Sequence, residues 1–266
     1  MIKHLLSILI VALFISNVKA QILDKEKLEC EYKFSWVNDT TKRSVRKEDF
    51  MILKVGDKVS EFYSYNTFRV DSAIQADLSK GMGAVEMLAK RASYGKKGVE
   101  YHIFKNYPSG KMTVTEKVGN DNFKYEETLN QKWQIQPQKA KVNGYAAQKA
   151  TCTFGGRQYT AWFTTEVPIA TGPWKFNGLP GLILNVEDST GDFRFELLGL
   201  HQVKGESVIS LPQKSYINTT KEGFMKVTAK YYKDPVAYLI ATSTVKITPA
   251  NGNQSKPRPY NPIELY

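Results

Sequence analysis

Cysteine and histidine are scarce in this chain of 266 residues, which holds two cysteines and three histidines. The histidines, His4, His102 and His201, are far apart in the sequence, and none lies near a cysteine. A structural zinc site takes about four closely spaced cysteine or histidine ligands. We therefore expect no metal site and no cofactor.

The sequence also lacks the motifs of common catalytic machinery. It contains no Gly-x-Ser-x-Gly elbow, no His-Glu-x-x-His pair and no glycine-rich phosphate loop. His102 shares a predicted strand face with Glu100 and Phe104, which favours a structural histidine. Asp188 and Asp192 flank a hairpin loop, where aspartate commonly serves turn geometry. We expect no enzymatic activity and keep a hydrolase as the less favoured alternative.

Long apolar runs are absent as well, because no stretch approaches the roughly 18 consecutive apolar residues of a membrane-spanning helix. The longest run, Leu5 to Ile15, is broken only by Ser7 and is followed by Val18-Lys19-Ala20. Such an arrangement predicts a secretory signal peptide at residues 1–20 with cleavage before Gln21. An N-terminal membrane anchor is the alternative. We expect an exported protein with no transmembrane segment after signal removal.

The formal net charge is +11, which by itself is compatible with nucleic acid, anionic membranes or acidic ligands. The lysines alternate with aromatic residues, as in Tyr32-Lys33-Phe34 and Phe123-Lys124-Tyr125. This alternation is typical of a solvated sheet face. Together with export, it argues against a nucleic-acid partner.

Alternation of apolar and polar residues recurs along the chain and predicts half-buried β-strands. Turn residues such as Gly56-Asp57, Pro108-Ser109-Gly110 and Gly119-Asn120-Asp121 separate the segments. The predicted strands are 28–37, 49–55, 58–65, 99–107, 111–118, 123–129, 133–136, 145–154, 157–165, 182–187, 193–198 and 202–211. Short strands at roughly ten-residue spacing indicate an antiparallel β architecture.

Two segments have helical spacing. Residues 71–93 are expected to form two short helices split at Gly81-Met82-Gly83, with Asp71 or Ser72 as N-cap. Residues 220–232 are expected to form a second helical segment with Thr219 or Thr220 as N-cap, and Asp234-Pro235 is expected to start another short helix. We predict a mainly β fold, with one large curved antiparallel sheet or partial barrel and one or two helices on its concave face. A closed barrel or a sandwich is the alternative. A single domain covers residues 21–248, and a polar, proline-rich tail covers residues 249–266.

Both cysteines fall on apolar strand faces. Cys30 alternates in phase with Leu28, Tyr32 and Phe34, and Cys152 is in phase with its apolar neighbours. Export makes a disulfide chemically feasible. The two residues are either bonded to each other or are two small buried hydrophobic side chains.

The connection at residues 166–181 is unusually long for a compact domain, and long loops are commonly functional or disordered. Its Trp174, Phe176 and Leu179 need burial, which argues for an ordered loop. Pro180 and Gly181 fit a type II turn within Leu179–Leu182. The structural turn residues are therefore Gly172, Gly178, Pro180 and Gly181.

Residues 178–183 spell Gly-Leu-Pro-Gly-Leu-Ile, and this hexapeptide resembles the motif that names the GLPGLI family of exported Bacteroidetes proteins. Further similar segments include Phe62-Tyr63-Ser64, Ala161-Trp162-Phe163-Thr164, Gly172 to Phe176 and Asn261 to Leu265. The resemblance implies the periplasm or the outer-membrane periphery of a Gram-negative envelope. Members of that family are often encoded near TonB-dependent outer-membrane receptors, and the resemblance implies little chemistry.

Two function classes follow. The first is a binding or carrier module that holds an apolar or peptide ligand in the concave face of the sheet. The second is a structural protein with an outer-membrane protein as partner. Candidate ligand or partner contacts are Arg157, Tyr159, Trp162, Pro173, Trp174, Phe176 and Leu179. Arg157 either clamps an anion or forms a buried ion pair or stacking contact. An aromatic cavity would favour the first class, and an exposed apolar loop the second.

Overall fold

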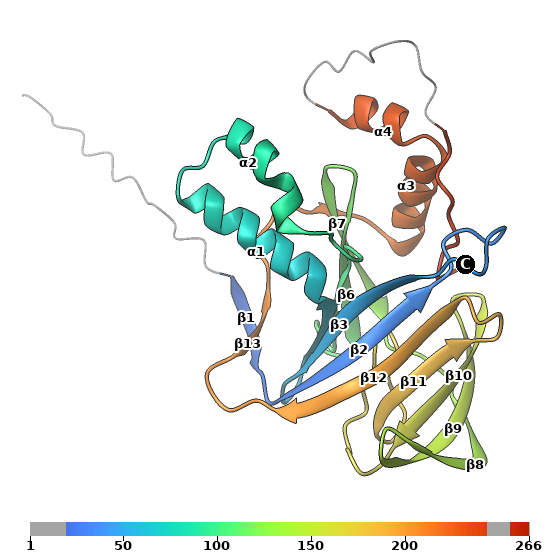
Figure 1. Cartoon of the computed structure of the whole chain (residues 1–266). Helices are drawn as coiled ribbons and strands as arrows, with labels where there is room; N and C mark the ends of the chain where they lie inside the picture. Colours follow the sequence, from blue (N-terminus) through green and yellow to red (C-terminus); the bar gives the residue numbers. More distant parts are fainter. Residues whose placement is uncertain (1–19, 244–255, 266) are drawn as a thin grey trace, which may run out of the picture.

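The computed structural model describes residues 20–243 and 256–265. The predicted signal peptide lies outside these residues except for Ala20. The fold is mainly β, and Figure 1 shows a large bent sheet with helices at one end. The strands are β1 (Gln21–Lys25), β2 (Leu28–Trp36), β3 (Lys47–Val55), β4 (Ser60–Ser64), β5 (His102–Lys105), β6 (Lys111–Val118), β7 (Asp121–Thr128), β8 (Gln134–Val142), β9 (Tyr145–Phe154), β10 (Arg157–Thr164), β11 (Leu182–Asp188), β12 (Phe193–Gln202), β13 (Val208–Leu211) and β14 (Ile217–Asn218).

The helical elements are α1 (Tyr65–Ser79), α2 (Ala84–Lys90), a 3₁₀ turn at Arg91–Tyr94, α3 (Lys221–Lys233) and α4 (Pro235–Thr242). Within the described part of the chain, every helix is too short or too polar to cross a membrane.

The large sheet has twelve strands in the order β14-β7-β6-β5-β4-β3-β2-β12-β11-β10-β9-β8. Neighbouring strands are antiparallel except β14, which runs parallel to β7. The two ends of this order, β14 and β8, are not paired with each other, so the sheet is open. The predicted mainly β fold with one large curved sheet is confirmed.

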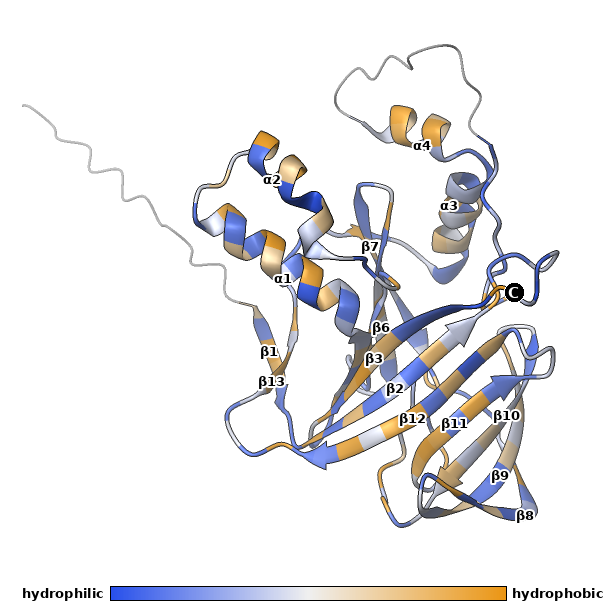
Figure 2. Cartoon of the chain, in the orientation of Figure 1, coloured by the Kyte–Doolittle hydropathy of each residue, from blue (hydrophilic) through white to orange (hydrophobic). Residues whose placement is uncertain are grey.

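The strands alternate as their sequences predict. Along β2, for example, Cys30, Tyr32 and Phe34 are buried and belong to the main core cluster. Figure 2 shows the same alternation of apolar and polar residues along β2 and β12. We call the face that carries the core cluster the inner face of the sheet, and the opposite face the outer face.

The first helical segment is split at residues 80–83, as predicted, but it begins earlier than predicted. The Ser64 side chain, at the end of β4, accepts a hydrogen bond from the Thr67 backbone N–H at 3.0 Å and caps α1. The predicted caps, Asp71 and Ser72, lie inside the helix. A serine directly after a buried strand satisfies the first free N–H groups of the helix, so the helix starts there.

The predicted starts of the other two helices are confirmed. The Thr220 side chain accepts a hydrogen bond from the Gly223 N–H at the start of α3. The Asp234 side chain accepts one from the Ala237 N–H, with Pro235 in the first turn of α4.

The helices lie on both faces of the sheet. On α3, Phe224 packs against Phe123 and Tyr125 of the inner face, at ring distances of 5.9 and 5.2 Å. On α1, Phe68 packs against Tyr63, which points to the outer face because Phe62 points inward. The strands β1 and β13 form a separate two-stranded sheet.

The two cysteines are buried and free, so the disulfide that the sequence left open is not formed in this structure. Cys30 lies on β2 and Cys152 on β9, with β12, β11 and β10 between them in the sheet order. Neighbouring strands are about 4.8 Å apart, which places the two positions far beyond disulfide reach along the sheet. Burial raises the pKa of each thiol to about 12.

The described part of the predicted tail, residues 256–265, has no regular secondary structure but is bonded to the fold. The Asn261 side chain donates hydrogen bonds to the Val37 carbonyl and the Asp192 carboxylate, at 2.9 and 3.0 Å. The Leu265 N–H donates to the Gly155 carbonyl at 2.6 Å. Glu264 is buried. This segment therefore contributes to the core side of the sheet.

Candidate functional site

The 166–181 loop is part of the core. Trp174, Phe176 and Leu179 are each at most 2% exposed, and Pro173 is buried. The rings of Trp174 and Phe176 are 5.1 Å apart, and both lie against Phe195 of β12 at 6.4 and 6.2 Å. The loop therefore fills the inner face of the bent sheet and does not present its aromatic residues to solvent.

Glycine is required in this loop where backbones approach closely. A Cβ on Gly181 would lie 2.0 Å from the Thr164 carbonyl oxygen, and Gly181 has φ +153°. The Gly181 N–H donates to the Leu179 carbonyl at 2.8 Å, so this turn is tighter than the predicted type II turn. The Gly181 backbone passes so close to the Thr164 carbonyl at the end of β10 that there is no room for a side chain. Pro180 is exposed.

Two other glycines serve the same loop. Gly178 has φ +86°, a value that favours glycine. A Cβ on Gly172 would lie 2.6 Å from the Cβ of Ile183 on β11. The glycines that the sequence predicts as turn residues therefore set the path of the loop.

Lys105, which sequence analysis did not single out, holds the loop from inside. Its side chain is 3% exposed, and its ammonium donates hydrogen bonds to the carbonyls of Gly172, Trp174 (3.1 Å) and Phe176 (3.2 Å). Burial lowers the pKa of Lys105 to about 7. Three carbonyl acceptors match the three donors of the ammonium group, so Lys105 is a structural anchor.

A second buried lysine comes from the loop itself. The Lys175 ammonium pairs with Glu264 at 2.5 Å and with Glu127, and Lys221 of α3 contacts both carboxylates. Burial alone would lower the pKa of Lys175, but Glu264 and Glu127 raise it above its usual value. Burial would raise the pKa of Glu264, but Lys175 and Lys221 hold it below its usual value. These four residues form a neutral group that ties the loop, β7, α3 and residues 256–265 together.

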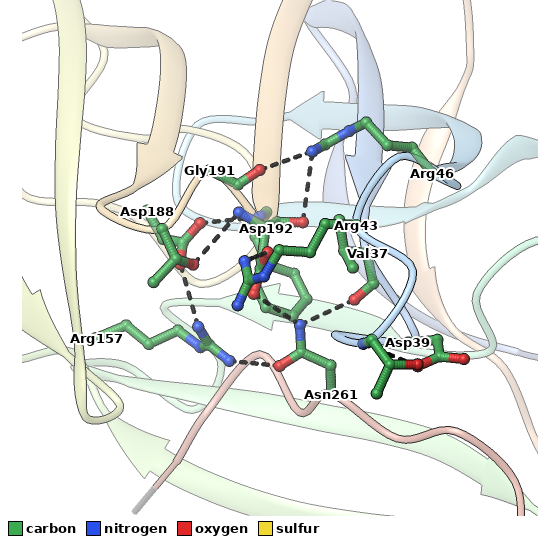
Figure 3. A network of polar contacts seen from close by, with 12 residues as sticks. Val37, Asp39, Arg43, Arg46, Arg157, Asp188, Gly191, Asp192 and Asn261 are labelled. Carbon is green, nitrogen blue, oxygen red and sulfur yellow. Dashed lines mark hydrogen bonds and ion pairs between the residues drawn. The ribbon is translucent and has the colours of Figure 1, made fainter.

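The guanidinium of Arg157 is hydrogen-bonded within the protein itself. Its guanidinium pairs with Asp188 at 3.1 Å and donates to the Asn261 side chain and the Pro262 carbonyl, each at 2.8 Å. It also lies 4.6 Å from the centre of the Phe193 ring. Figure 3 shows Arg157, Asp188 and Asn261 in one polar network with Asp192 and Arg43. All three guanidinium nitrogens donate hydrogen bonds, so this geometry matches a buried ion pair and not an open anion clamp.

The other two predicted contact residues lie on opposite faces. The Tyr159 hydroxyl donates to the Ile263 carbonyl at 3.1 Å on the inner face. Trp162 lies on the outer face, where it lines a shallow depression with Asn185 and Glu196. The predicted residues therefore do not form one site. Tyr159, Trp174 and Phe176 pack together in the core, whereas Trp162 is partly buried at its edge and takes no part in these ring contacts.

A cavity of about 150 Å³ lies on the inner face between the sheet, α3 and residues 260–264. Aromatic side chains from all three parts line it. They include Phe34 and Trp36 of β2, Tyr101 before β5, Phe224 and Tyr232 of α3, and Tyr260.

Two polar side chains of this cavity lack partners. Tyr101 is 8% exposed, and its hydroxyl has no hydrogen-bond partner within the described chain. Glu116 of β6 lines the same cavity and forms none of the ion pairs or hydrogen bonds found among the described residues. Burial raises the pKa of Glu116 to about 7, although its side chain keeps some solvent contact. A buried polar group without a partner, such as the Tyr101 hydroxyl, costs free energy, so it marks a place where a ligand can supply the missing partner.

The sequence contains a local signal for Glu116, which is a carboxylate at an otherwise apolar position of a strand. On β6, Met112, Val114 and Val118 point to the inner face, and the same two-residue period places Glu116 among them. A carboxylate on an apolar strand face is an exception to the alternation, and such exceptions commonly mark functional positions.

A larger cleft of about 870 Å³ opens between β7, β9 and the start of α3. Its walls are mainly polar and carry several charged side chains, of which Glu127 and Lys221 pair with each other. On the outer face, Glu29, Glu31 and His201 bring ligand atoms within 4.8 Å of one another. His201 is exposed and neighbours Glu29 across β2 and β12, which is compatible with a solvated polar surface.

Comparison with known proteins gives a family match and a fold likeness. Residues 98–185 match the family model described as "Protein of unknown function (Porph_ging)". This segment contains Tyr101, Lys105, Glu116, Arg157 and the 166–181 loop. No curated protein matches the chain.

The structure comparison finds two crystal structures of PNGF-II, and the fold is similar to one of them. The structure in the C2 space group has a TM-score of 0.50 at 12% identity and covers 78% of this chain. The structure in the P21 space group has a TM-score of 0.49 at 11% identity and covers 76% of this chain. This chain spans about a third of the PNGF-II chain. At this identity the likeness concerns the fold alone. The segment that matches the family model, residues 98–185, includes the 166–181 loop and two of the cavity residues discussed above, Tyr101 and Glu116.

Proposed function

We propose that this protein is a non-catalytic binding or carrier module whose ligand occupies the aromatic cavity beneath α3. The observation that carries the proposal is a cavity rich in aromatic rings, in which the buried Tyr101 hydroxyl has no partner in the described chain and the partly exposed Glu116 carboxylate pairs with no described side chain. Ligand sites are typically apolar pockets with a few placed polar groups. The predicted apolar or peptide ligand in the concave face fits this arrangement.

The size of the cavity limits what it can enclose. A dry cavity of about 150 Å³ binds one benzene molecule in another protein. The volume here is similar, so it suits one aromatic ring or one apolar side chain of a peptide. Tyr260 lines the cavity and is 39% exposed, so the rest of a longer ligand can extend to the surface there.

The alternative function, a partner of an outer-membrane complex, has less support. It required the 166–181 loop as an exposed contact, but Trp174 and Phe176 are buried in the core. Arg157 is also occupied by Asp188 and Asn261.

The location in the cell envelope is part of the proposal. It rests on the predicted signal peptide at residues 1–20 and on the resemblance to the exported GLPGLI proteins. N-terminal sequencing of the protein from its native envelope should give Gln21 as the first residue. Full-length protein in the membrane fraction would contradict export with cleavage.

Binding can be tested with 2-phenylethanol, a neutral single-ring molecule, and the indole N–H signals of the four tryptophans. Trp36 and Trp174 line the cavity, and Trp162 lies on the outer face. We expect a saturable shift of the Trp36 and Trp174 signals while the Trp162 signal stays in place.

Two phenylalanine variants on α3 provide the control. Thr228 is buried and lines the cavity, whereas the adjacent Ala229 is exposed. Thr228→Phe should fill the cavity and weaken binding at least about tenfold, a loss of about 1.4 kcal/mol. Ala229→Phe should bind like the wild type. An unshifted wild-type spectrum, or equal binding by both variants, would contradict the proposal.

A further inference from the structure

Glu116 is a carboxylate on the apolar face of a strand. Its neighbours on that face, Val114 and Val118, are at most 4% exposed and belong to the core. A carboxylate that is largely removed from water costs free energy unless a charge or hydrogen-bond donor pairs with it. Glu116 keeps some solvent contact but pairs with no described side chain, so its carboxylate is open to a partner from outside the chain.

The charges around the cavity leave Glu116 unbalanced. Lys175 and Glu264 also line the cavity, but they pair with each other and with Glu127 and Lys221. Nearby Glu100 is 3.5 Å from Lys97. The lining therefore carries one net negative charge when Glu116 is ionised.

The remaining walls are suited to a cation. Phe34 and Trp36 stack at 4.7 Å, and Tyr101 is a further ring of the cavity. Aromatic faces attract ammonium groups, and the attraction is largest where water is excluded. The Tyr101 hydroxyl, which has no partner in the described chain, offers an oxygen as acceptor.

We propose that the cavity binds an organic amine, whose ammonium group pairs with Glu116 and Tyr101 while its apolar part lies among the aromatic rings. This inference rests on the proposed function and specifies its ligand class. Neutral apolar molecules fill the same space but leave the carboxylate unpaired.

Amine binding should depend on pH through Glu116. Burial raises the pKa of this carboxyl to about 7, Lys175 opposes the shift, and Glu100 and Glu264 add to it. A group with this pKa is about nine tenths ionised at pH 8 and about one tenth ionised at pH 6. Affinity for an amine should therefore fall about tenfold from pH 8 to pH 6, because a primary alkylamine stays protonated throughout.

The test compares 2-phenylethylamine with 2-phenylethanol by calorimetry at pH 8 and pH 6. We expect the amine to bind at least about tenfold more tightly than the alcohol at pH 8. Glu116→Gln should remove this preference and its pH dependence. Glu126→Gln is the matched control, because Glu126 lies on β7, is exposed and lines only the open cleft.

The outcomes separate the two proposals. If the wild type binds both molecules in the cavity with equal affinity, the proposal of an amine ligand is wrong, but the proposed function as a binding module still holds. Loss of the amine preference in Glu126→Gln, with Glu116→Gln unchanged, would place the amine in the open cleft and overturn the inference. Binding of neither molecule would overturn the proposed function as well.

Discussion

Glu116→Gln should make the protein more stable at pH 8 although it removes the proposed ligand contact. The pKa of Glu116 is raised from 4.5 to about 7 by burial. The folded state therefore keeps this proton to a higher pH than the unfolded state. The stabilisation from protonated Glu116 is fully present below about pH 4.5 and is lost as pH rises through about 7. Glutamine resembles the protonated side chain at every pH.

The expected gain follows from the shift. A difference of about 2.5 pKa units corresponds to roughly 3 kcal/mol at most. The side chain keeps some solvent contact, and screening reduces this to about 1–2 kcal/mol. For a domain of this size, the melting temperature should rise by roughly 2–8 °C at pH 8 and by almost nothing at pH 4.5.

Thermal melts of the wild type and Glu116→Gln at both pH values measure this effect. Equal stability at pH 8, or a destabilised variant, would refute the reasoning, because it would mean that the carboxylate has an internal partner. A gain of the same size at pH 4.5 would point to packing and not to charge.

Three further predictions concern the core. Gly181→Ala should lower the free energy of unfolding in urea by at least about 2 kcal/mol, because the new Cβ would lie 2.0 Å from the Thr164 carbonyl oxygen. A loss below about 0.5 kcal/mol would show that the two backbone segments can move apart. Trp174→Ala should cost about 3–5 kcal/mol, since the ring is 2% exposed, and an unchanged melting temperature would mean that the loop is not core. Cys30 and Cys152 should titrate as two thiols after denaturation without reductant and should resist modification in the folded protein; one disulfide per chain would contradict the structure.

Local patterns account for most of what the sequence predicted correctly. Strand alternation depends on adjacent residues, and helix caps such as Thr220 and Asp234 act within a few residues. The start of α1 was misplaced because Ser64 belongs by pattern to the strand before it. Its capping role depends on where β4 ends, which tertiary packing decides.

The site was harder to predict because its contacts join distant parts of the chain. Lys175 is 89 residues from Glu264, and Lys105 is 67 residues from Gly172. No local pattern states such pairings. Arg157 stands out in the sequence as a lone arginine, but its hydrogen bonds depend partly on Asn261, which is 104 residues away. Glu116 had a local signal, the break in the apolar period of β6.

A crystal structure of the protein with 2-phenylethylamine, grown at pH 8, tests the central claim most directly. The account predicts the phenyl ring in the cavity between Trp36, Tyr101 and Phe224, with the amine nitrogen at hydrogen-bond distance, about 3 Å, from the Glu116 carboxylate. A cavity that stays empty while the amine lies in the polar cleft beside Lys221 would contradict it.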